Sequence, residues 1–255
     1  MEDILFASDL DNTLLFSRRH RRAGDLCVEH LSGEEQGFMT PLAVQLLRIV
    51  RDGLRFIPVT TRSVEQYLRI AWPEGTAPEY AVTTNGAVLL HHGVEDAVWR
   101  AEHAALLADA QEEIARQYER HAGRDAFIRC RIVDGAYLFT YCADHVDPAA
   151  CAARCRAETS LTVLHAGRKI YFFPEGLDKG AAVRALCRRF APRRVYAAGD
   201  SAIDLPLLMA ADCAFAPCGL PGADSPHIRR HAGAEPFSEW LLGALRDEAL
   251  PAHDA

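Results

Sequence analysis

The sequence predicts an α/β fold: a Rossmann-like parallel sheet core with helices on both faces, plus an inserted α+β cap domain. Three observations lead to this prediction. Short apolar segments alternate with helical patterns over the first 84 residues, strand patterns outnumber helical ones in the middle, and the alternation returns after Pro174. Alternating strands and helices favour a parallel sheet, whereas many strands with few helices favour an α+β unit.

The first stretch is predicted as strand, helix, strand, helix, strand. An apolar stripe with helical spacing follows Thr40, the expected N-cap, and Pro41 in the first turn; Gly53 is expected to close this helix. Ser63 is the expected N-cap of the second helix. The predicted elements are Ile4–Ser8, Pro41–Arg51, Arg55–Val59, Ser63–Ile70 and Tyr80–Thr83.

The middle of the chain has a different pattern. Two helices are predicted, Ala104–His121 and Pro148–Glu158. The predicted strands are Ala87–Leu90, Ala97–Arg100, Phe127–Ile132, Tyr137–Tyr141, Leu161–Leu164 and Lys169–Phe173. The resulting order, ββ-α-ββ-α-ββ, is typical of a small α+β module with a helix pair on one face of its sheet.

The parallel pattern returns after this module, with elements expected at Lys179–Phe190, Arg194–Ala198, Ala202–Met209, Cys213–Ala216 and Phe237–Leu245. We therefore expect residues 1–84 and 175–255 to form the core and residues 85–174 to form a cap inserted into it. Gly and Pro at the two crossings, near Asn85 and Pro174, suit a hinge. The polar tail after Leu250 is expected to be frayed.

Composition narrows the function classes. The 255 residues carry a net charge of −7, which argues against general binding of nucleic acid or of anionic membranes. No segment reaches the length of a membrane span, and Glu2 and Asp3 precede the first apolar run where a signal peptide would carry positive charge. The eight cysteines form no CxxC pair, as expected for free thiols. These features predict a soluble, cytoplasmic protein.

A pair of carboxylates follows the first strand. Asp9 and Asp11 lie two residues apart, so in an extended segment they point to the same side. Like charges so close repel unless a cation lies between them or one is protonated. The alternative is a strand that ends in an Asx-rich turn.

Further polar residues follow other core strands. Thr60 follows the second strand, Asp200 and Asp204 follow the strand Arg194–Ala198, and Lys179 opens the helix before it. Ligands of open α/β sheets bind beyond the carboxyl ends of the strands. Carboxylates there would supply the oxygen ligands that Mg²⁺ prefers, a lysine and a hydroxyl would bind phosphoryl oxygens, and one Asp could attack phosphorus.

The ordered set Asp9-Leu10-Asp11-Asn12-Thr13, Thr60, Lys179 and Gly199-Asp200-x-x-x-Asp204 resembles the four motifs of the haloacid dehalogenase (HAD) superfamily. Thr84-Asn85-Gly86-Ala87 and Gly176-Leu177-Asp178-Lys179-Gly180 resemble its sugar-phosphatase-like branch (Cof-type and sucrose-phosphatase-like), and the resemblance covers the whole chain.

The resemblance implies a role for each motif residue. Asp9 would be the nucleophile that forms an aspartyl-phosphate, and Asp11 the general acid and base. Asp9, the backbone carbonyl of Asp11 and Asp200 would hold Mg²⁺, with Asp204 supporting the metal site. Thr60 and Lys179 would hold the phosphoryl group.

Several assignments have alternatives. Asp204 could simply cap the following helix, and Thr61 could replace Thr60. Asn12, Arg62 and Asn85 are possible substrate contacts, although Arg62 could be an exposed residue at a helix start and Asn85 a turn residue. The basic run 18–22 could attract an anionic substrate from a flap beside the site or be solvated surface. Only one of Arg168 and Lys169 can point into the cleft from a strand.

The function predicted from these features is a Mg²⁺-dependent phosphatase that hydrolyses a small phosphorylated metabolite, possibly a sugar phosphate, through an aspartyl-phosphate. No nucleic-acid or membrane partner is expected. The alternatives are a phosphomutase of the same chemistry, or a catalytically idle binding or regulatory protein on the same scaffold.

Overall fold

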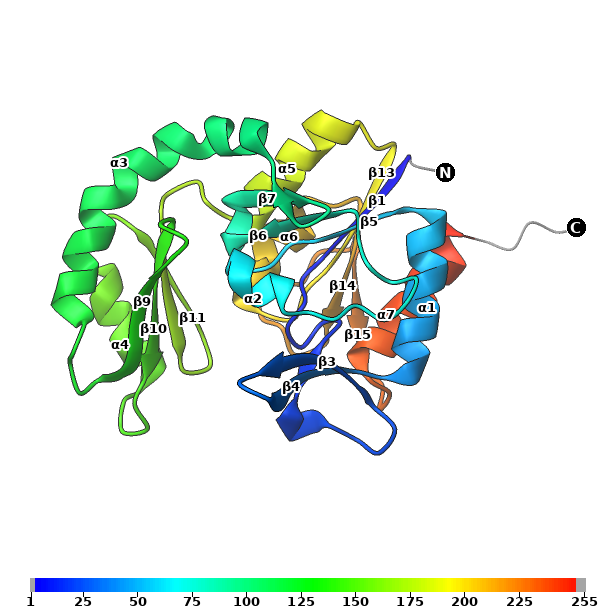
Figure 1. Cartoon of the computed structure of the whole chain (residues 1–255), viewed down its shortest axis with the longest axis horizontal. Coiled ribbons are helices and arrows are strands. Elements are labelled where there is room, and N and C mark those ends of the chain that lie inside the picture. Colours follow the sequence, from blue (N-terminus) through cyan, green and yellow to red (C-terminus); the bar gives the residue numbers. More distant parts are fainter. Residues whose placement is uncertain (1–2, 251–255) are drawn as a thin grey trace, which may run out of the picture.

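A computed structural model of the chain describes residues 3–250. Its centre is a sheet of five parallel strands in the order β15-β14-β13-β1-β5 (Figure 1). Every residue of β1 is buried, as expected for the middle strand of a covered parallel sheet. The strands are β1 (Ile4–Ser8), β5 (Arg55–Pro58), β13 (Arg194–Ala198), β14 (Cys213–Pro217) and β15 (Ile228–His231).

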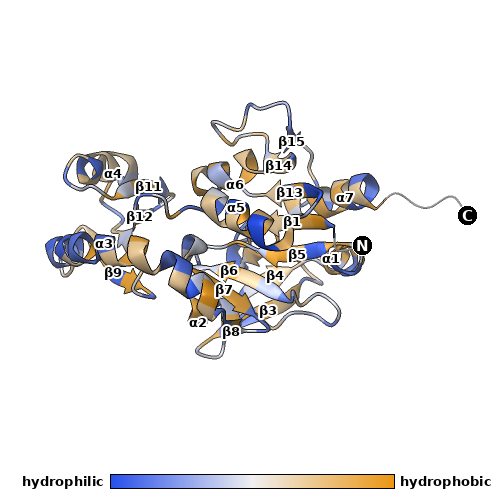
Figure 2. Ribbon diagram, turned by 90° about the horizontal axis from the view of Figure 1, so that it is seen from above, coloured by the Kyte–Doolittle hydropathy of each residue, from blue (hydrophilic) through white to orange (hydrophobic). Residues whose placement is uncertain are grey.

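Helices cover both faces of this sheet. Alternate residues of β1 supply the two apolar layers: Phe6 packs toward α1 (Pro41–Gly53) and α7 (Phe237–Ala249), and Leu5 packs toward α5 (Lys179–Phe190) and α6 (Leu205–Met209). Figure 2 shows the apolar strands enclosed between these helices. The arrangement confirms the predicted α/β core with helices on both faces.

The strand β6 (Tyr80–Thr83) continues the core sheet by one parallel bridge, from Val59 to Val82. It pairs mainly with β7 (Val88–His91), which pairs with β8 (Val94–Glu95), in an antiparallel sheet. The short turn η2 (Thr84–Gly86) joins β6 to β7. The strand predicted at Ala87–Leu90 thus forms as β7, but it pairs with β6 beside the core and not with the segment Ala97–Arg100.

The segment Ala97–Arg100, predicted as a strand, is helical. It is the first turn of α3 (Ala97–His121), a helix that leads from the core to the cap (Figure 1). Two interactions fix the helix start: the Asp96 side chain accepts from the Trp99 N–H, and the buried Trp99 indole donates to the Gly86 carbonyl at 2.9 Å. The N-cap and the burial of Trp99 outweigh the strand preference of these apolar residues.

The cap consists of an antiparallel sheet in the order β11-β12-β10-β9, with α3 and α4 on one face. The predicted order ββ-α-ββ-α-ββ thus becomes α-ββ-α-ββ after β8. The elements that follow α3 are β9 (Phe127–Val133), β10 (Tyr137–Cys142), α4 (Pro148–Arg156), β11 (Thr162–Ala166) and β12 (Lys169–Phe173).

A three-stranded flap follows β1 and was not predicted as strands. It contains β2 (Phe16–Ser17), the turn η1 (Arg18–His20), β3 (Leu26–Leu31) and β4 (Glu34–Met39). Most apolar residues of β3 and β4 are grouped at 26–28 and 38–39 instead of alternating with polar ones, so these strands lack a period-2 apolar pattern.

Smaller differences concern element ends. Gly53 is the last helical residue of α1 rather than its stop, since Leu54 is the C-cap, and 202–209 divides into η3 (Ala202–Asp204) and α6. The short helix α2 (Val64–Leu68) begins at a Ser63 capping box, as expected. The core and cap boundaries at 84/85 and 174/175 remain a prediction, and the tail predicted to fray lies outside the described residues.

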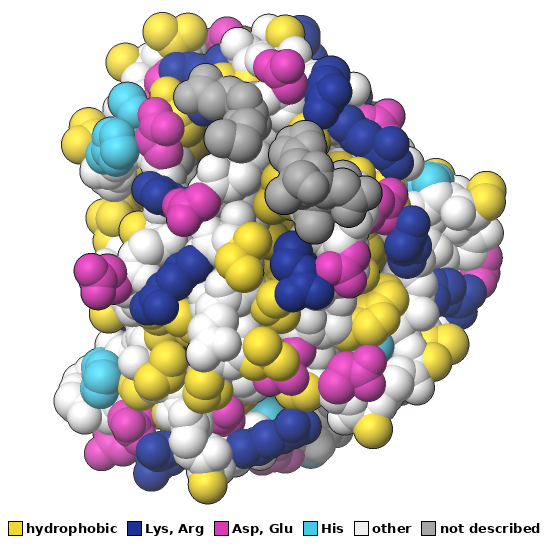
Figure 3. Space-filling view, turned by 90° about the vertical axis from the view of Figure 1, so that its right-hand side faces the viewer, with side chains coloured by type: hydrophobic (Ala, Val, Ile, Leu, Met, Phe, Trp, Pro, Cys, Tyr) yellow, Lys and Arg dark blue, Asp and Glu magenta, His cyan; other side chains and the backbone are white. Residues whose placement is uncertain are grey.

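Other expectations concern the whole molecule. All eight cysteines are free. Within residues 3–250, no helix combines the length and apolarity that crossing a membrane requires. The end of the molecule that faces away from the cap mixes charges of both signs with scattered apolar side chains (Figure 3).

Hydrogen bonds join the cap to the core beside the carboxyl end of the sheet. Tyr137 donates its phenol O–H to the Thr61 carbonyl at 2.5 Å. Asp134, in the turn between β9 and β10, accepts from the Val64 N–H at 2.9 Å and from the Thr84 hydroxyl. These bonds orient the open face of the cap sheet toward the core.

Candidate active site

Three carboxylates converge where the core strands end. Asp9 directly follows β1, and Asp200 and Asp204 follow β13, the strand that pairs with β1 in parallel register. Each of the three offers a carboxylate oxygen within 4.8 Å of the others. The predicted juxtaposition of Asp9 and Asp200 is therefore present, and the three groups could hold a metal ion between them.

Lys179 lies beneath these carboxylates. Its side chain is 2% exposed, and its Nζ contacts Asp9 Oδ1 at 2.5 Å and Asp204 Oδ1 at 2.6 Å. Burial disfavours the charged amine, but the carboxylates of Asp204 and Asp9 outweigh that effect and raise the pKa of Lys179. A permanently charged lysine is thus built into the floor of the site.

One lysine does not neutralise three carboxylates. Burial raises the pKa of Asp9 well above its usual range, and the charges of Asp204, Asp200 and Asp11 raise it further against the attraction of Lys179. Burial, followed by the charge of Asp204, raises the pKa of Asp200 to about 7. The site is short of positive charge, and a divalent cation bound by these oxygens would relieve the repulsion.

Asp204 organises the loop after β13. Its Oδ2 accepts from the Asp200 N–H at 3.1 Å, and from the Ser201 N–H and hydroxyl at 2.9 and 2.8 Å. Its side chain makes no capping bond into α6, but it forms a capping box with Ser201 at the start of η3, so Asp204 has a capping role beside its place among the site carboxylates. The loop folds tightly around Asp204: a Cβ at Gly199 would lie 2.4 Å from the Asp204 Cβ.

The position of Lys179 depends on a close approach between α5 and the segment of α6. Gly180, in the first turn of α5, faces the backbone of the α6 segment, and a Cβ on it would lie 2.4 Å from the Pro206 carbonyl oxygen. The missing side chain lets α5 contact this segment and brings Lys179 within reach of Asp204.

We expect Gly180→Ala to lower the free energy of unfolding by about 1–3 kcal/mol, the usual cost of overpacking. The matched control is Gly243→Ala in α7, where the added Cβ meets no atom within 4 Å. Helix propensity should make that control neutral or stabilising by up to about 1 kcal/mol. Urea unfolding followed by circular dichroism measures both, and equal stability of the two variants would contradict the close approach.

Asp11 has a different environment from Asp9. Arg62 binds it through two nitrogens, with Nη2–Oδ1 at 2.7 Å and Nε–Oδ2 at 3.0 Å. The same guanidinium contacts Glu29 Oε2 at 2.8 Å, and Glu29 also contacts Arg69. Desolvation opposes the ionisation of Asp11, but the charge and hydrogen bonds of Arg62 outweigh it and lower the pKa of Asp11.

The remaining predicted residues are placed as follows. Asn12, at positive φ, lines the cleft above the carboxylates. Thr60 is fully buried and accepts from the Arg62 N–H, whereas Thr61 lines the cleft. Asn85 is 1% exposed and donates to the Leu177 carbonyl at 3.1 Å. Asn85 therefore ties the two crossings together instead of facing the substrate.

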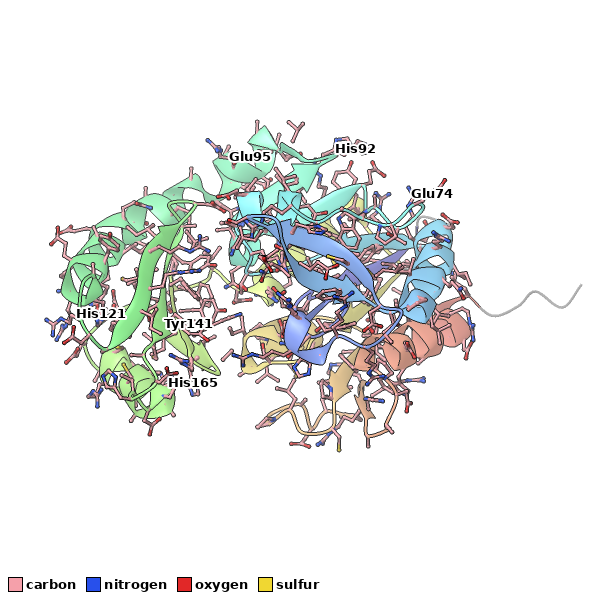
Figure 4. The ribbon with its side chains drawn as sticks, turned by 60° about the horizontal axis from the view of Figure 1, so that its bottom comes forward. Glu74, His92, Glu95, His121, Tyr141 and His165 are labelled. Atoms are coloured by element: carbon pink, nitrogen blue, oxygen red, sulfur yellow. The ribbon has the colours of Figure 1, made fainter. Side chains whose placement is uncertain are left out.

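The carboxylates open into a cleft of about 560 Å³ between core, flap and cap. The core supplies the residues already described, and the flap supplies Ser17, Arg19 and His20. The cap supplies the far wall, namely Tyr141, His165, Ala166, Gly167, Arg168, Lys169 and Tyr171. Figure 4 shows Tyr141 and His165 on the side of the cap that faces the core, and His121 on the opposite side.

Most of the flap and cap residues at the cleft were not singled out by sequence reasoning. In the basic run 18–22, Arg18 and Arg21 pair with Glu34 and Glu35, while Arg19 reaches the cleft. On the cap, both Arg168 and Lys169 line the cleft, against the prediction that only one would, because Arg168 lies in the turn before β12 and not on a strand; Arg168 also bonds the Cys142 carbonyl. The alternation of Arg129 and Arg131 with Cys130 in β9 was the available signal for the basic face of the cap sheet.

Comparison with solved structures finds the same fold over nearly the whole chain. The sucrose-phosphatase from Synechocystis, in complex with sucrose and phosphate, matches with a TM-score of 0.65 at 16% identity over 96% of this chain and 97% of that chain. A haloacid dehalogenase-like hydrolase from B. subtilis matches with a TM-score of 0.59 at 16% identity, over 96% and 99% of the two chains. A trehalose-6-phosphate phosphatase from Aspergillus fumigatus matches at 0.55 and 14% identity, over 96% and 93%.

These similarities confirm the resemblance to HAD-type phosphatases at the level of the fold. No family model and no curated protein matches the sequence.

Proposed function

We propose that this chain is a Mg²⁺-dependent phosphomonoester hydrolase of the HAD superfamily that acts on a small phosphorylated metabolite. The observation that carries the proposal is the convergence of the Asp9, Asp200 and Asp204 carboxylates at the carboxyl end of the sheet, where the Lys179 ammonium contacts Asp9 and Asp204. With a divalent cation bound, this arrangement would hold a phosphoryl group through the positive charge of the cation and of Lys179, and would present a carboxylate to it. The fold shared with sucrose and trehalose-6-phosphate phosphatases supports the same reaction class.

The donor set fits a magnesium ion. Asp9, Asp200 and the carbonyl of Asp11 are the proposed ligands, Asp204 is the supporting residue, and hard oxygens are the ligands that Mg²⁺ prefers. When bound, the ion would neutralise charge on the phosphoryl oxygens.

The proposed chemistry has two steps. In the first, an Asp9 carboxylate oxygen attacks phosphorus, the bond from phosphorus to the leaving oxygen breaks, and Asp11 gives that oxygen a proton. In the second, Asp11 takes a proton from water as that water attacks phosphorus. The aspartyl-phosphate then breaks, which frees inorganic phosphate and restores Asp9. Lys179 and a hydroxyl, from Thr60 or Thr61, would hold the phosphoryl oxygens.

The environment of Asp11 suits the second step as it stands. Arg62 keeps Asp11 ionised, which is the state of a general base. The first step needs a protonated Asp11 that points to the leaving oxygen. Asp11 must therefore break its hydrogen bonds with Arg62 and turn toward the substrate. Its side chain is 43% exposed toward the cleft, which leaves room for that exchange.

The proposed substrate is a small phosphorylated metabolite, such as a sugar phosphate. A cleft of about 560 Å³ has the size of an ordinary metabolite site, and the cap closes it from above. The eight free cysteines suit the reducing cytoplasm that we propose as its location.

The test is phosphate release from a panel of sugar phosphates, other phosphorylated metabolites and p-nitrophenyl phosphate, with Mg²⁺ or with excess chelator. We expect release with Mg²⁺ and none with chelator. Full activity in chelator would contradict the metal assignment. An isomerised sugar phosphate as the product would indicate a mutase. If no compound is turned over, the proposal that the chain is an enzyme is contradicted.

The affinity for Mg²⁺ should depend on pH, because a raised pKa means that Asp200 holds a proton near neutrality. Binding must displace that proton, so the affinity should fall roughly tenfold per pH unit below about 7 for this proton alone, and the raised pKa of Asp9, the other carboxylate ligand, adds to the fall. Calorimetric titration with MgCl₂ at pH 6, 7 and 8 in buffers of different ionisation enthalpy measures the affinity and the released protons. Affinity that is constant from pH 6 to 8 would contradict the displacement.

A further inference from the structure

A second pocket adjoins the cleft on the side of Asp11. This side pocket has a volume of about 250 Å³ and shares Asp11, Lys169 and Tyr171 with the cleft. Its other lining residues are strongly basic or aromatic: Arg62, Arg69, Arg129, Arg131, Tyr137, Phe139 and Tyr141, together with Glu29, Thr61 and Gln66. The chemistry described so far uses none of the cap arginines.

The strand register explains why these residues share one face of the cap sheet. Arg131 pairs with Phe139, which pairs with Tyr171, so all three point the same way. In the next row, Arg129 pairs with Tyr141, which pairs with Lys169. The opposite face carries apolar side chains that pack against α3 and α4, such as Leu138, Ile170 and Phe172. The face without a helix is therefore the basic and aromatic one, and it meets the core.

The charges of the side pocket do not balance within the protein. Arg62 and Arg69 are matched by Asp11 and Glu29. Arg129, Arg131 and Lys169 form no ion pair with any residue in the range 3–250. Arg131 has a buried Nε with no hydrogen-bond partner and lies over the Phe139 ring at 5.7 Å. A buried unpaired donor is costly, which favours a partner from outside the chain.

The position of the side pocket indicates which part of the substrate reaches it. The phosphoryl group would lie against Asp9 on the cleft side, with Lys179 beside it, and Asp11 would protonate the leaving oxygen. A group that extends past Asp11 into the side pocket therefore belongs to the leaving group.

We propose that the leaving group carries a second anionic group, a carboxylate or a second phosphate, which binds Arg129, Arg131 and Lys169 in the side pocket. This inference rests on the proposed phosphatase activity and narrows its substrate class to metabolites with two separated anionic groups. A neutral sugar phosphate would leave the three cations without a partner.

Matched substrate pairs test the proposal. In the first pair, 3-phosphoglycerate has a carboxylate where glycerol 3-phosphate has a hydroxymethyl group. In the second pair, fructose 1,6-bisphosphate has a second phosphate that fructose 6-phosphate lacks. With Mg²⁺ present, we expect kcat/KM to be at least about 10-fold higher for the doubly anionic member of one pair, in line with one charge-assisted contact. The pair that shows the preference identifies the anion as carboxylate or phosphate. Equal rates within both pairs, or a preference for the neutral members, would overturn the proposal.

Variants of the cap arginines test which residues cause the preference for the doubly anionic substrate. Arg131→Gln and Arg129→Gln should each shrink the preference within the favoured pair about 10-fold, mainly through KM, and Arg131→Lys should recover part of it. Arg154→Gln is the control, since Arg154 is exposed on α4, beyond the other face of the cap sheet. Equal losses on both members of a pair would mean that the arginines are structural.

The outcome also separates the two proposals. If no compound, including p-nitrophenyl phosphate, is hydrolysed, the phosphatase proposal fails. Calorimetric binding of 3-phosphoglycerate and glycerol 3-phosphate to the protein then still decides whether a second anion strengthens binding. Weaker or equal binding of 3-phosphoglycerate would overturn the anion subsite, whatever the activity.

Discussion

Asp9→Asn is expected to lower kcat for phosphate release by at least about 10⁴-fold, the scale on which removal of a catalytic nucleophile acts in other enzymes. An amide oxygen is a poor nucleophile, so the aspartyl-phosphate cannot form. Asn has nearly the shape of Asp and can still accept from the Lys179 ammonium, which retains Asp204 as its charged partner at 2.6 Å. The loss should therefore be chemical rather than structural.

The same substitution should not destabilise the metal-free protein. Burial and three neighbouring carboxylates raise the pKa of Asp9, so its charged form is disfavoured in the folded state. Because the folded state holds this proton more tightly than the unfolded state, the stability contributed by Asp9 is present at low pH and is lost as the pH rises through the raised pKa. A neutral Asn avoids that loss, so the unfolding midpoint near neutral pH should equal or exceed that of the wild type.

The control is Asp109→Asn, an exposed position on α3 that should change neither activity nor stability. Phosphate release is measured with Mg²⁺ on the best substrate of the panel, and stability by urea unfolding without metal. Turnover of Asp9→Asn within tenfold of the wild type would remove Asp9 as the nucleophile. Loss of the folded state would show that the charge of Asp9 is structural.

The site carboxylates could be predicted because they depend on topology alone. The sequence pattern predicts β1, β13 and α5 with the same bounds as the structure, and parallel strands bring their carboxyl ends to one edge. Asp9, Asp200 and Lys179 meet for that reason. The contact needs no knowledge of how individual side chains pack.

Other parts of the site depend on tertiary contacts that no local pattern reveals. Arg62 pairs with Glu29, which is 33 positions away in the sequence and lies on a flap strand whose apolar residues do not alternate with polar ones. The predicted start of α3 at Ala104 was wrong because the segment 97–100 is too short to distinguish a helical from a strand period. Asp96, as a potential N-cap, was the better signal. Arg129 and Arg131 could be placed on one strand face from sequence. That this face meets the core, however, follows only from where α3 and α4 pack.

The substitution with the second-largest expected effect is Lys179→Met, which removes the buried cation and keeps an apolar chain of similar length. Asp9 and Asp204 would then face each other without the ammonium that contacts both. Removing one partner of a buried charge cluster typically costs about 3–5 kcal/mol of unfolding free energy. We also expect phosphate release to be lost, because the positive charge under the phosphoryl group is gone.

Conditions that supply positive charge by another route should recover part of the stability of Lys179→Met. Mg²⁺ should raise its unfolding midpoint more than that of the wild type, because binding relieves a larger repulsion. Acidification from pH 8 to 6 should narrow the difference from the wild type, since protons on Asp9 or Asp200 replace the lost charge. Lys169→Met is the matched control: Lys169 forms no ion pair with the described residues, so its loss should leave stability within about 0.5 kcal/mol. A stability loss for Lys179→Met that is independent of both Mg²⁺ and pH would point to lost packing instead of carboxylate repulsion.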